Sequence, residues 1–161
     1  MSGTIIIPEA LDRRSRYAAL LPQVEALMAG ETDAIAAMAN LSAALHTAFG
    51  WHWVGFYRVI GEELVLGPFQ GPVACNRIAF GKGVCGTAWS EGRTQVVPDV
   101  DLFPGHIACS ALSRSEIVIP LIGKAGKVEA VLDVDSAHLN DFDHDDAEQL
   151  AALCRRLETL L

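Results

Sequence analysis

The sequence predicts an α+β fold in which a central antiparallel sheet packs against helices. Three observations carry this prediction: the chain opens with two helical segments, short strands with turn signals fill its middle, and an amphipathic helix closes it. Consecutive strands flanked by helices are typical of this class. The 161 residues are 51% hydrophobic and contain no repeat or linker. We therefore expect one domain over residues 1–161, whose core needs no disulfide or metal.

The first fifty residues are expected to form two helices. Residues 9–29 are rich in Ala, Leu, Arg and Glu, and Pro22 predicts a break or kink within this helix. A second helix is expected from a cap at Thr32 or Asp33 to about Phe49, because apolar residues recur there at helical spacing. The first helix carries a short basic patch that we expect to be solvated, formed by Arg13, Arg14 and Arg16.

The middle of the chain is expected to supply the sheet. β-Branched and aromatic residues, with turns between them, predict strands at residues 53–60, from 64, at 75–80, 94–97, 115–122 and 128–134. The first two of these strands read as a hairpin, and so do the last two. A short helix is expected at residues 84–90, directly after a glycine-rich turn.

The closing helix has the clearest signals. Asp143 is expected to cap it, acidic residues follow in its first turn, and two arginines lie near its end, an order that suits the helix dipole. Cys154 lies on the apolar stripe of this helix, and we expect it to be a structural residue of the core.

Charge and hydropathy exclude several classes of protein. The net charge of −8 argues against nucleic acid or an anionic membrane as a partner. No apolar run approaches the roughly 20 residues of a membrane helix, and the N-terminus lacks the features of a signal peptide. We therefore expect a cytoplasmic protein, in a compartment where thiols stay reduced.

Three cysteines within one 35-residue stretch are the main chemical signal: Cys75, Cys85 and Cys109. Their separations of ten and twenty-four residues lack the close pairs of a zinc site. A zinc-binding module therefore remains only an alternative, and no metal is expected. Thiol chemistry, in which one sulfur attacks and another resolves, is the favoured interpretation.

The surroundings of two of these cysteines suggest reactivity. Cys109 closes a loop that begins at Pro104, and loops held by a rigid scaffold often carry reactive groups. His106, three residues before Cys109, would lower the thiol pKa if it were an imidazolium. Cys85 follows a glycine-rich turn at the start of the predicted short helix, where unpaired N–H groups favour a thiolate.

Acidic and aromatic residues form a second signal. Alternation along a strand places Asp133 and Asp135 on one face, and Glu116 joins them if the neighbouring strand pairs with theirs. Carboxylates this close need a cation between them or a retained proton; the alternative is that all three are solvated strand ends. Trp53 and Tyr57 also share a strand face. They belong either to the core or to the wall of a pocket for a small apolar group.

Seven segments carry a resemblance to a known family: residues 53–57, 67–71, 74–75, 81–88, 105–109, 115–118 and 132–136. On these segments the chain resembles the free methionine-(R)-sulfoxide reductases, which are single-domain members of the GAF fold. The resemblance implies a GAF-like architecture. It also implies the activity of an L-methionine (R)-S-oxide reductase, an oxidoreductase associated with oxidative stress.

The same resemblance implies roles for individual residues. Cys109 would be the nucleophile, Cys75 the main resolving thiol, and Cys85 a participant in disulfide exchange. The substrate pocket would contain Trp53, Tyr57, Glu116, Asp133 and Asp135. The family commonly has Asp directly after the catalytic cysteine, whereas this chain has Ser110.

The resemblance also implies how the reaction would run. No bound cofactor is expected; thioredoxin, supplied with electrons from NADPH by thioredoxin reductase, would be the external reductant, and a homodimer is possible. Glu116 is our first choice for the group that protonates the sulfoxide oxygen. The alternative is a non-catalytic GAF module that senses a small molecule or the redox state through a regulatory disulfide.

Overall fold

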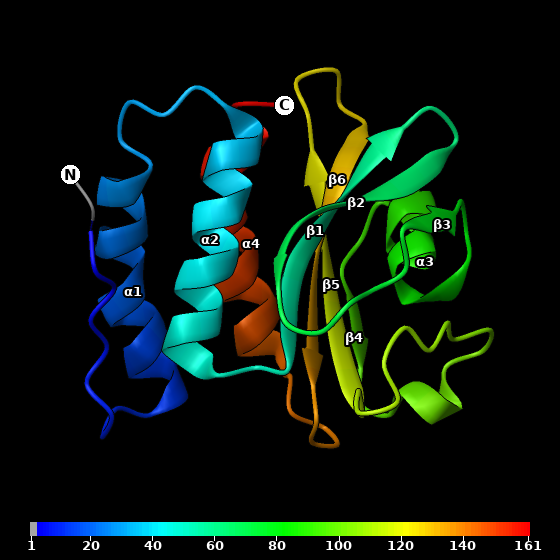
Figure 1. Cartoon of the computed structure of the whole chain (residues 1–161), viewed down its shortest axis with the longest axis horizontal. Helices are drawn as coiled ribbons and strands as arrows, with labels where there is room; N and C mark the ends of the chain where they lie inside the picture. Colours follow the sequence, from blue (N-terminus) through cyan, green and yellow to red (C-terminus); the bar gives the residue numbers. More distant parts are fainter. Residues whose placement is uncertain (1–2) are drawn as a thin grey trace.

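The computed structural model describes residues 3–161 and contains a six-stranded antiparallel sheet with the strand order β3-β2-β1-β6-β5-β4 (Figure 1). The strands are β1 (Trp53–Ile60), β2 (Glu63–Gln70), β3 (Arg77–Ala79), β4 (Gln95–Val97), β5 (Ser115–Ile122) and β6 (Val128–Ser136). The helices are α1 (Arg13–Leu27), α2 (Ala34–Phe49), α3 (Gly83–Glu91) and α4 (His144–Glu158), with a 3-10 turn, η1, at Val100–Leu102. The predicted α+β fold is confirmed.

The helices divide between the two faces of the sheet (Figure 1). Helices α2 and α4 pack on one face and α1 packs on those two helices, whereas α3 contacts the strands from the other face. Within residues 3–161, no helix combines the length and the apolar character needed to cross a bilayer.

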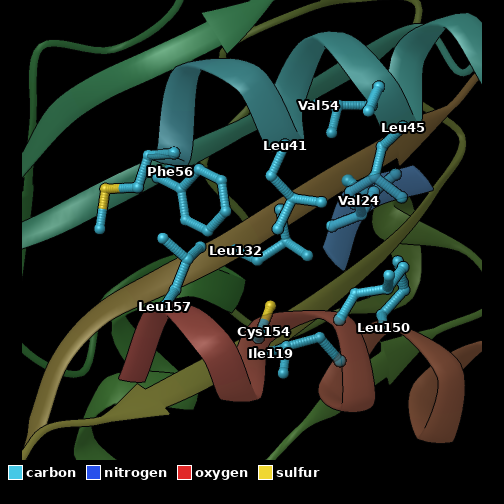
Figure 2. Packing of buried hydrophobic residues seen from close by; sticks show 14 of the residues in the cluster. Val24, Leu41, Leu45, Val54, Phe56, Ile119, Leu132, Leu150, Cys154 and Leu157 are labelled. Carbon is cyan, nitrogen blue, oxygen red and sulfur yellow. The ribbon is translucent and has the colours of Figure 1, made fainter. Parts of the chain in front are cut away.

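The face covered by α2 and α4 carries the main hydrophobic core. Figure 2 shows Leu41 and Leu45 of α2 and Leu150 of α4 packed around sheet residues that include Leu132. Each buried leucine contributes about 1.5–3 kcal/mol relative to an exposed one. Cys154 is 1% exposed within this cluster, so the prediction that it is a core residue is confirmed.

The two N-terminal helices form where they are expected, with one difference. The side chain of Asp33 caps α2, and Gly50 ends that helix with a φ of 67°. The predicted break at Pro22 is wrong, because α1 continues through this residue. Leu20 and Val24, on either side of Pro22, are both buried in the core, and this packing outweighs the loss of one helical hydrogen bond.

The basic patch on α1 is not solvated as expected. Arg13 forms ion pairs with Asp141 and Asp146, at nitrogen–oxygen distances of 2.6 and 3.1 Å. Arg16 donates hydrogen bonds to three main-chain carbonyl groups, among them that of Ala48 at the end of α2. Both side chains therefore tie α1 to the rest of the fold.

Two strand boundaries matter for the site. Strand β3 is shorter than the predicted 75–80, and Cys75 lies in the loop before it. The Cys75 carbonyl accepts a hydrogen bond from the Tyr57 hydroxyl at 2.9 Å rather than from a neighbouring strand. Strand β6 extends beyond the predicted end to Ser136, so the two aspartates that precede it lie within the sheet.

Candidate active site

A pocket lies on the face of the sheet opposite α2 and α4, beside α3. The residues that line it come from β1, the loop between β2 and β3, β3, the start of α3 with the residue before it, the segment after η1, β5 and β6. Seven of the eight residues that the sequence predicts for the site are among them: Trp53, Tyr57, Cys85, Cys109, Glu116, Asp133 and Asp135. The eighth, Cys75, reaches the same place through a covalent bond.

That bond is a disulfide between Cys75 and Cys109, whose Cα atoms are 5.6 Å apart. The two cysteines come from different loops, one between β2 and β3 and the other between η1 and β5. Both are half-buried, so a thiol from solvent can approach the bond. The two remaining cysteines, Cys85 and Cys154, are free and buried.

The loop that carries Cys109 is seated on the start of α3. Ile107 packs over Gly83, where an added Cβ would approach the isoleucine side chain to 3.2 Å. Gly83 also has a φ of 59°, a conformation that favours glycine. This glycine therefore lets the loop lie close enough for Cys109 to line the pocket.

Three carboxyl groups form the polar side of the pocket. Strands β5 and β6 pair Glu116 with Asp135, and Val118 with Asp133, so that all three acids face the same side of the sheet. Glu116 is 6% exposed and Asp133 is 7% exposed. The alternative of solvated strand ends is wrong for these two residues.

Nothing neutralises this cluster within the part of the chain that the structure describes. No lysine or arginine forms a salt bridge with any of the three acids there. The Oδ1 atom of Asp133 is buried without a hydrogen-bond partner. The pocket thus holds an acceptor for which the folded protein itself supplies no donor.

Burial is the main reason why the pKa values of these three carboxyl groups are raised. It raises the pKa of Glu116 well above the usual range, and the nearby charge of Asp135 raises it further. Burial likewise raises the pKa of Asp133 and of Asp135, with further contributions from the charges of Glu116 and Asp133 respectively. The cluster therefore retains protons at a pH where exposed carboxyl groups are ionised.

The thiol of Cys85 lies close to the acidic cluster. Its sulfur is 4.0 Å from Oε1 of Glu116, and the residue is 3% exposed. Burial, followed by the charges of Asp133 and Glu116, raises the pKa of the Cys85 thiol well above its usual value. The expectation of a thiolate at the start of α3 is therefore wrong, because desolvation and two acids outweigh the helix N-terminus.

His106 faces an acid instead of a thiol. Its Nε2 atom lies 3.7 Å from Oε2 of Glu116. Burial lowers the pKa of His106, an effect that Asp101 opposes, so the neutral imidazole is favoured. This disfavours the imidazolium that would have lowered the pKa of the Cys109 thiol.

Aromatic side chains of β1 lie beside the acids on the same face of the sheet. The rings of Trp53 and Tyr57 are 6.0 Å apart, and Phe69 of β2 stacks on Trp53 at 5.2 Å. Gly55 makes this stack possible, since an added Cβ there would lie 2.3 Å from the Cβ of Phe69 and 2.6 Å from the Trp53 ring. Trp53 and Tyr57 share a strand face as predicted, and they line the pocket.

Sequence reasoning missed two polar contacts of the site. Ser113, 8% exposed, opposes the rise in the pKa of Asp135, and His52 Nε2 lies 2.9 Å from Oγ of Ser110, the residue after Cys109. The only indication of Ser113 in the sequence is its position, two residues before the strand that carries Glu116. The His52 contact joins residues 58 positions apart, and no local pattern marks it.

Three donor groups lie close together in the acidic part of the pocket. One donor atom each from Cys85, Glu116 and Asp133 lies within 4.8 Å of the others. Cys75 and Cys109 are bonded to each other and offer no thiolate to a metal in this state, so the structure does not contain a zinc module built from the three cysteines.

Comparisons with known proteins extend this description. A family model described as "GAF domain" matches residues 32–161. "GAF domain-containing protein A" of Dictyostelium discoideum is 55% identical over 147 residues, which cover 91% of this chain and 92% of that protein. A protein of Escherichia coli named free methionine-R-sulfoxide reductase is 45% identical over 152 residues, covering 94% and 92% respectively.

A solved structure is similar over nearly the whole chain. It is that of free methionine-R-sulfoxide reductase from Neisseria meningitidis in complex with its substrate. The two structures agree with a TM-score of 0.91 at 54% sequence identity, over 96% of this chain and 94% of the other.

Proposed function

This chain belongs to the free methionine-R-sulfoxide reductases of the GAF domain family, and on that premise we propose that it reduces free L-methionine-(R)-sulfoxide to L-methionine. It would thus act as an L-methionine (R)-S-oxide reductase. The observation that carries the proposal is the Cys75–Cys109 disulfide beside a pocket of aromatic side chains and buried acids. The chain acts as one GAF-like domain over residues 1–161.

Cys109 is the nucleophile of this reaction. Its thiolate attacks the sulfoxide sulfur and forms a sulfur–sulfur bond, while a proton moves to the sulfoxide oxygen. Collapse of the adduct transfers the hydroxyl group to Cys109, so that methionine leaves with a reduced sulfur and Cys109 becomes a sulfenic acid. The Cys109 sulfur supplies the two electrons that reduce the sulfoxide.

Cys75 resolves the sulfenic acid. Its thiol attacks the Cys109 sulfur, water leaves, and the product is the disulfide that the structure contains. Cys85 would take part in a later disulfide exchange only after its buried thiol has lost its proton, because the thiolate is the form that attacks a disulfide.

Glu116 is the proton donor. A donor must be protonated near neutral pH and must stand at the reacting atoms. The raised pKa of Glu116 meets the first requirement, and its place in the same pocket as Cys109 supports the second.

Asp133 and Asp135 recognise the free amino acid. Free methionine carries an ammonium group. This group can donate a hydrogen bond to the unpartnered oxygen of Asp133 and can balance the charge of the carboxylate. Methionine within a protein lacks that group. Trp53 and Tyr57 supply the apolar surface on which the thioether methyl group packs.

An external dithiol completes the cycle. Thioredoxin, reduced by NADPH through thioredoxin reductase, is the partner that we propose, because the disulfide is accessible and no bound cofactor is needed for exchange. Such a cycle belongs in the cytoplasm, where these reductants are found. By analogy with the family, the protein would act as a homodimer.

The experiment is a coupled assay of NADPH consumption with thioredoxin and its reductase. Free and peptide-bound methionine sulfoxide, each as the R and the S epimer, are compared as substrates. We expect turnover of the free R epimer alone. Equal or faster turnover of the peptide-bound form would contradict the proposal, and binding without turnover would favour the non-catalytic sensor.

A further inference from the structure

The proposed cycle uses one proton from a buried group in every turnover. Attack by the Cys109 thiolate and release of methionine consume one proton, which Glu116 supplies, so Glu116 is left as a carboxylate. Disulfide formation with Cys75 releases water and returns no proton to this carboxylate. Since Glu116 is only 6% exposed, the proton needs a path back.

The neighbours of Glu116 differ in their access to solvent. On the side of Oε1 lies Cys85, with its sulfur at 4.0 Å, and this residue is 3% exposed. Asp133, the neighbouring acid, is 7% exposed. On the side of Oε2 lies Nε2 of His106 at 3.7 Å, and 14% of the His106 side chain remains exposed. Among Cys85, Asp133 and His106, the imidazole is the most exposed. Asp135, which pairs with Glu116 across β5 and β6, is the other partly exposed neighbour, but a carboxyl group whose pKa is itself raised by burial is a less ready source of protons from solvent than an imidazole.

We propose that His106 is the proton relay that restores the acid form of Glu116 between turnovers. This inference rests on the proposed function, and it gives His106 a positioning and relay role rather than direct contact with the substrate. An imidazole suits the task because a proton can enter at Nδ1 while another leaves at Nε2. A thiol in the same place has a single atom for both steps.

The electrostatic surroundings of His106 are consistent with a relay. Glu116 of β5 lies 3.7 Å from the imidazole, and the charge of Asp101 in η1 acts on it. The other charged and titratable groups that line the same pocket are Tyr57 of β1, Asp133 and Asp135 of β6, Cys85 of α3 and Lys82 before α3. Burial lowers the pKa of His106 while Asp101 opposes this shift. The imidazole is thus kept neutral at rest and can accept a proton transiently.

The distance between His106 and Glu116 allows a proton to be transferred after a small movement. At 3.7 Å, the pair is beyond normal hydrogen-bond distance. A bridging water or a slight rotation of the ring closes such a gap, and catalytic contacts commonly tighten when the substrate binds. The loop that carries His106 also carries Cys109, so a change at the thiol can move the imidazole.

The test separates the first turnover from the later ones in His106→Gln. Reduced protein begins with Glu116 already protonated, so a single turnover without dithiol should form methionine within about 2-fold of the wild-type rate. With excess dithiothreitol, kcat should fall at least about 10-fold, less than the roughly 100-fold or more of a direct acid–base group because His106 acts through Glu116, while KM stays within about 2-fold. His106→Asn provides a second variant if His106→Gln folds poorly.

A matched control exists on α4. His144 and Glu148 form an exposed pair with a nitrogen–oxygen distance of 3.1 Å, and His144 is not among the residues that line the pocket. His144→Gln should leave the first turnover and kcat unchanged within about 2-fold, since exposed pairs contribute little.

Two results would overturn the relay. If His106→Gln slows the first turnover as much as kcat and shifts the pH profile of Cys109 alkylation, the imidazole activates the thiolate instead. An unchanged kcat in the presence of dithiothreitol would exclude any relay through His106. Failure of the proposed function looks different, because the wild-type protein would then form no methionine even in its first turnover.

Discussion

Two buried aspartates, Asp146 among the helices and Asp133 in the pocket, have opposite surroundings. Asp146 accepts hydrogen bonds from the hydroxyl of Tyr17, the guanidinium of Arg13 and the main-chain N–H of Asp143, at 2.8–3.1 Å. Asp133 has one oxygen without any partner, and its neighbours are acids. The donors that Asp146 receives come from α1 and from the N-terminus of α4, so its burial holds these elements together.

The difference teaches how to distinguish a structural buried charge from a functional one. A buried polar atom without a partner costs about 1–3 kcal/mol, and a protein gains nothing from this during folding. The cost is regained only if a molecule from outside brings the missing donor. On this reasoning the Asp146 carboxyl group is satisfied by the fold itself, whereas the Asp133 carboxyl group is satisfied only when the substrate is bound.

The largest effect is expected at Cys109. Cys109→Ser should reduce methionine formation by at least about 1,000-fold, because a hydroxyl cannot replace the thiolate nucleophile. The melting temperature of the reduced protein should change little, since the side chain is half-buried and lies in a loop. Activity is measured by the NADPH-coupled assay and stability by thermal unfolding.

The matched control is the core cysteine. Cys154→Ala, within the cluster of the helical face, should lower the free energy of unfolding by about 1 kcal/mol and leave activity unchanged. Retained activity in Cys109→Ser, or lost activity in Cys154→Ala, would contradict the distinction between a catalytic cysteine in the pocket and a structural cysteine in the core.

A smaller effect is expected from pH. The pKa values of Glu116 and Asp133 are raised in the folded protein, so the folded state retains protons that the unfolded state releases. The stabilisation is complete below about pH 4 and is lost as the pH rises through the raised values. His106 acts in the opposite direction, because its pKa is lowered.

This effect is measured by comparing how the stability of the wild-type protein and that of Asp133→Asn change with pH. Urea unfolding between pH 5 and pH 7.5 should show that wild-type stability decreases with pH more steeply than the stability of Asp133→Asn, in which one titrating acid is removed. Parallel curves would mean that Asp133 is ionised throughout, as a structural carboxylate would be.

The smallest effect is expected at Ser110. Ser110→Ala removes one hydrogen bond to His52 and should cost about 1 kcal/mol or less. The readout is the rate at which the Cys75–Cys109 disulfide forms after one turnover, which should slow by less than about 5-fold if the contact only positions the loop. A loss of 100-fold would show that Ser110 belongs to the chemistry.

Much of the fold could be predicted because its signals are local. The cap at Asp33, the hairpin that begins at residue 53 and the apolar stripe that contains Cys154 all depend on residues close together in the sequence. The register of β5 and β6 needed only that the two strands pair, and it brought Glu116 beside the aspartates. Pro22 was the exception, because packing on both sides of it decided the outcome.

The chemistry of single side chains could not be predicted in the same way. A glycine-rich turn suggested a thiolate at Cys85, but the acids that raise its pKa come from β5 and β6. His106 stands near Cys109 in sequence, yet the fold turns it towards Glu116. Arg13 reads as a surface residue until α4 is packed beside it. In each case the deciding neighbour is distant in the chain.

The contrast between Asp146 and Asp133 is tested most directly by a paired measurement on Asp146→Asn and Asp133→Asn. The free energy of unfolding and kcat/KM are determined for each variant. Asp146→Asn should lose about 2–4 kcal/mol of stability, because Arg13 and Tyr17 lose their acceptor, while its kcat/KM stays within about 3-fold. Asp133→Asn should keep or slightly gain stability, while its kcat/KM falls at least about 100-fold, as expected when a desolvated charged contact to the substrate is lost. The opposite pattern, a destabilised but fully active Asp133→Asn, would contradict the account.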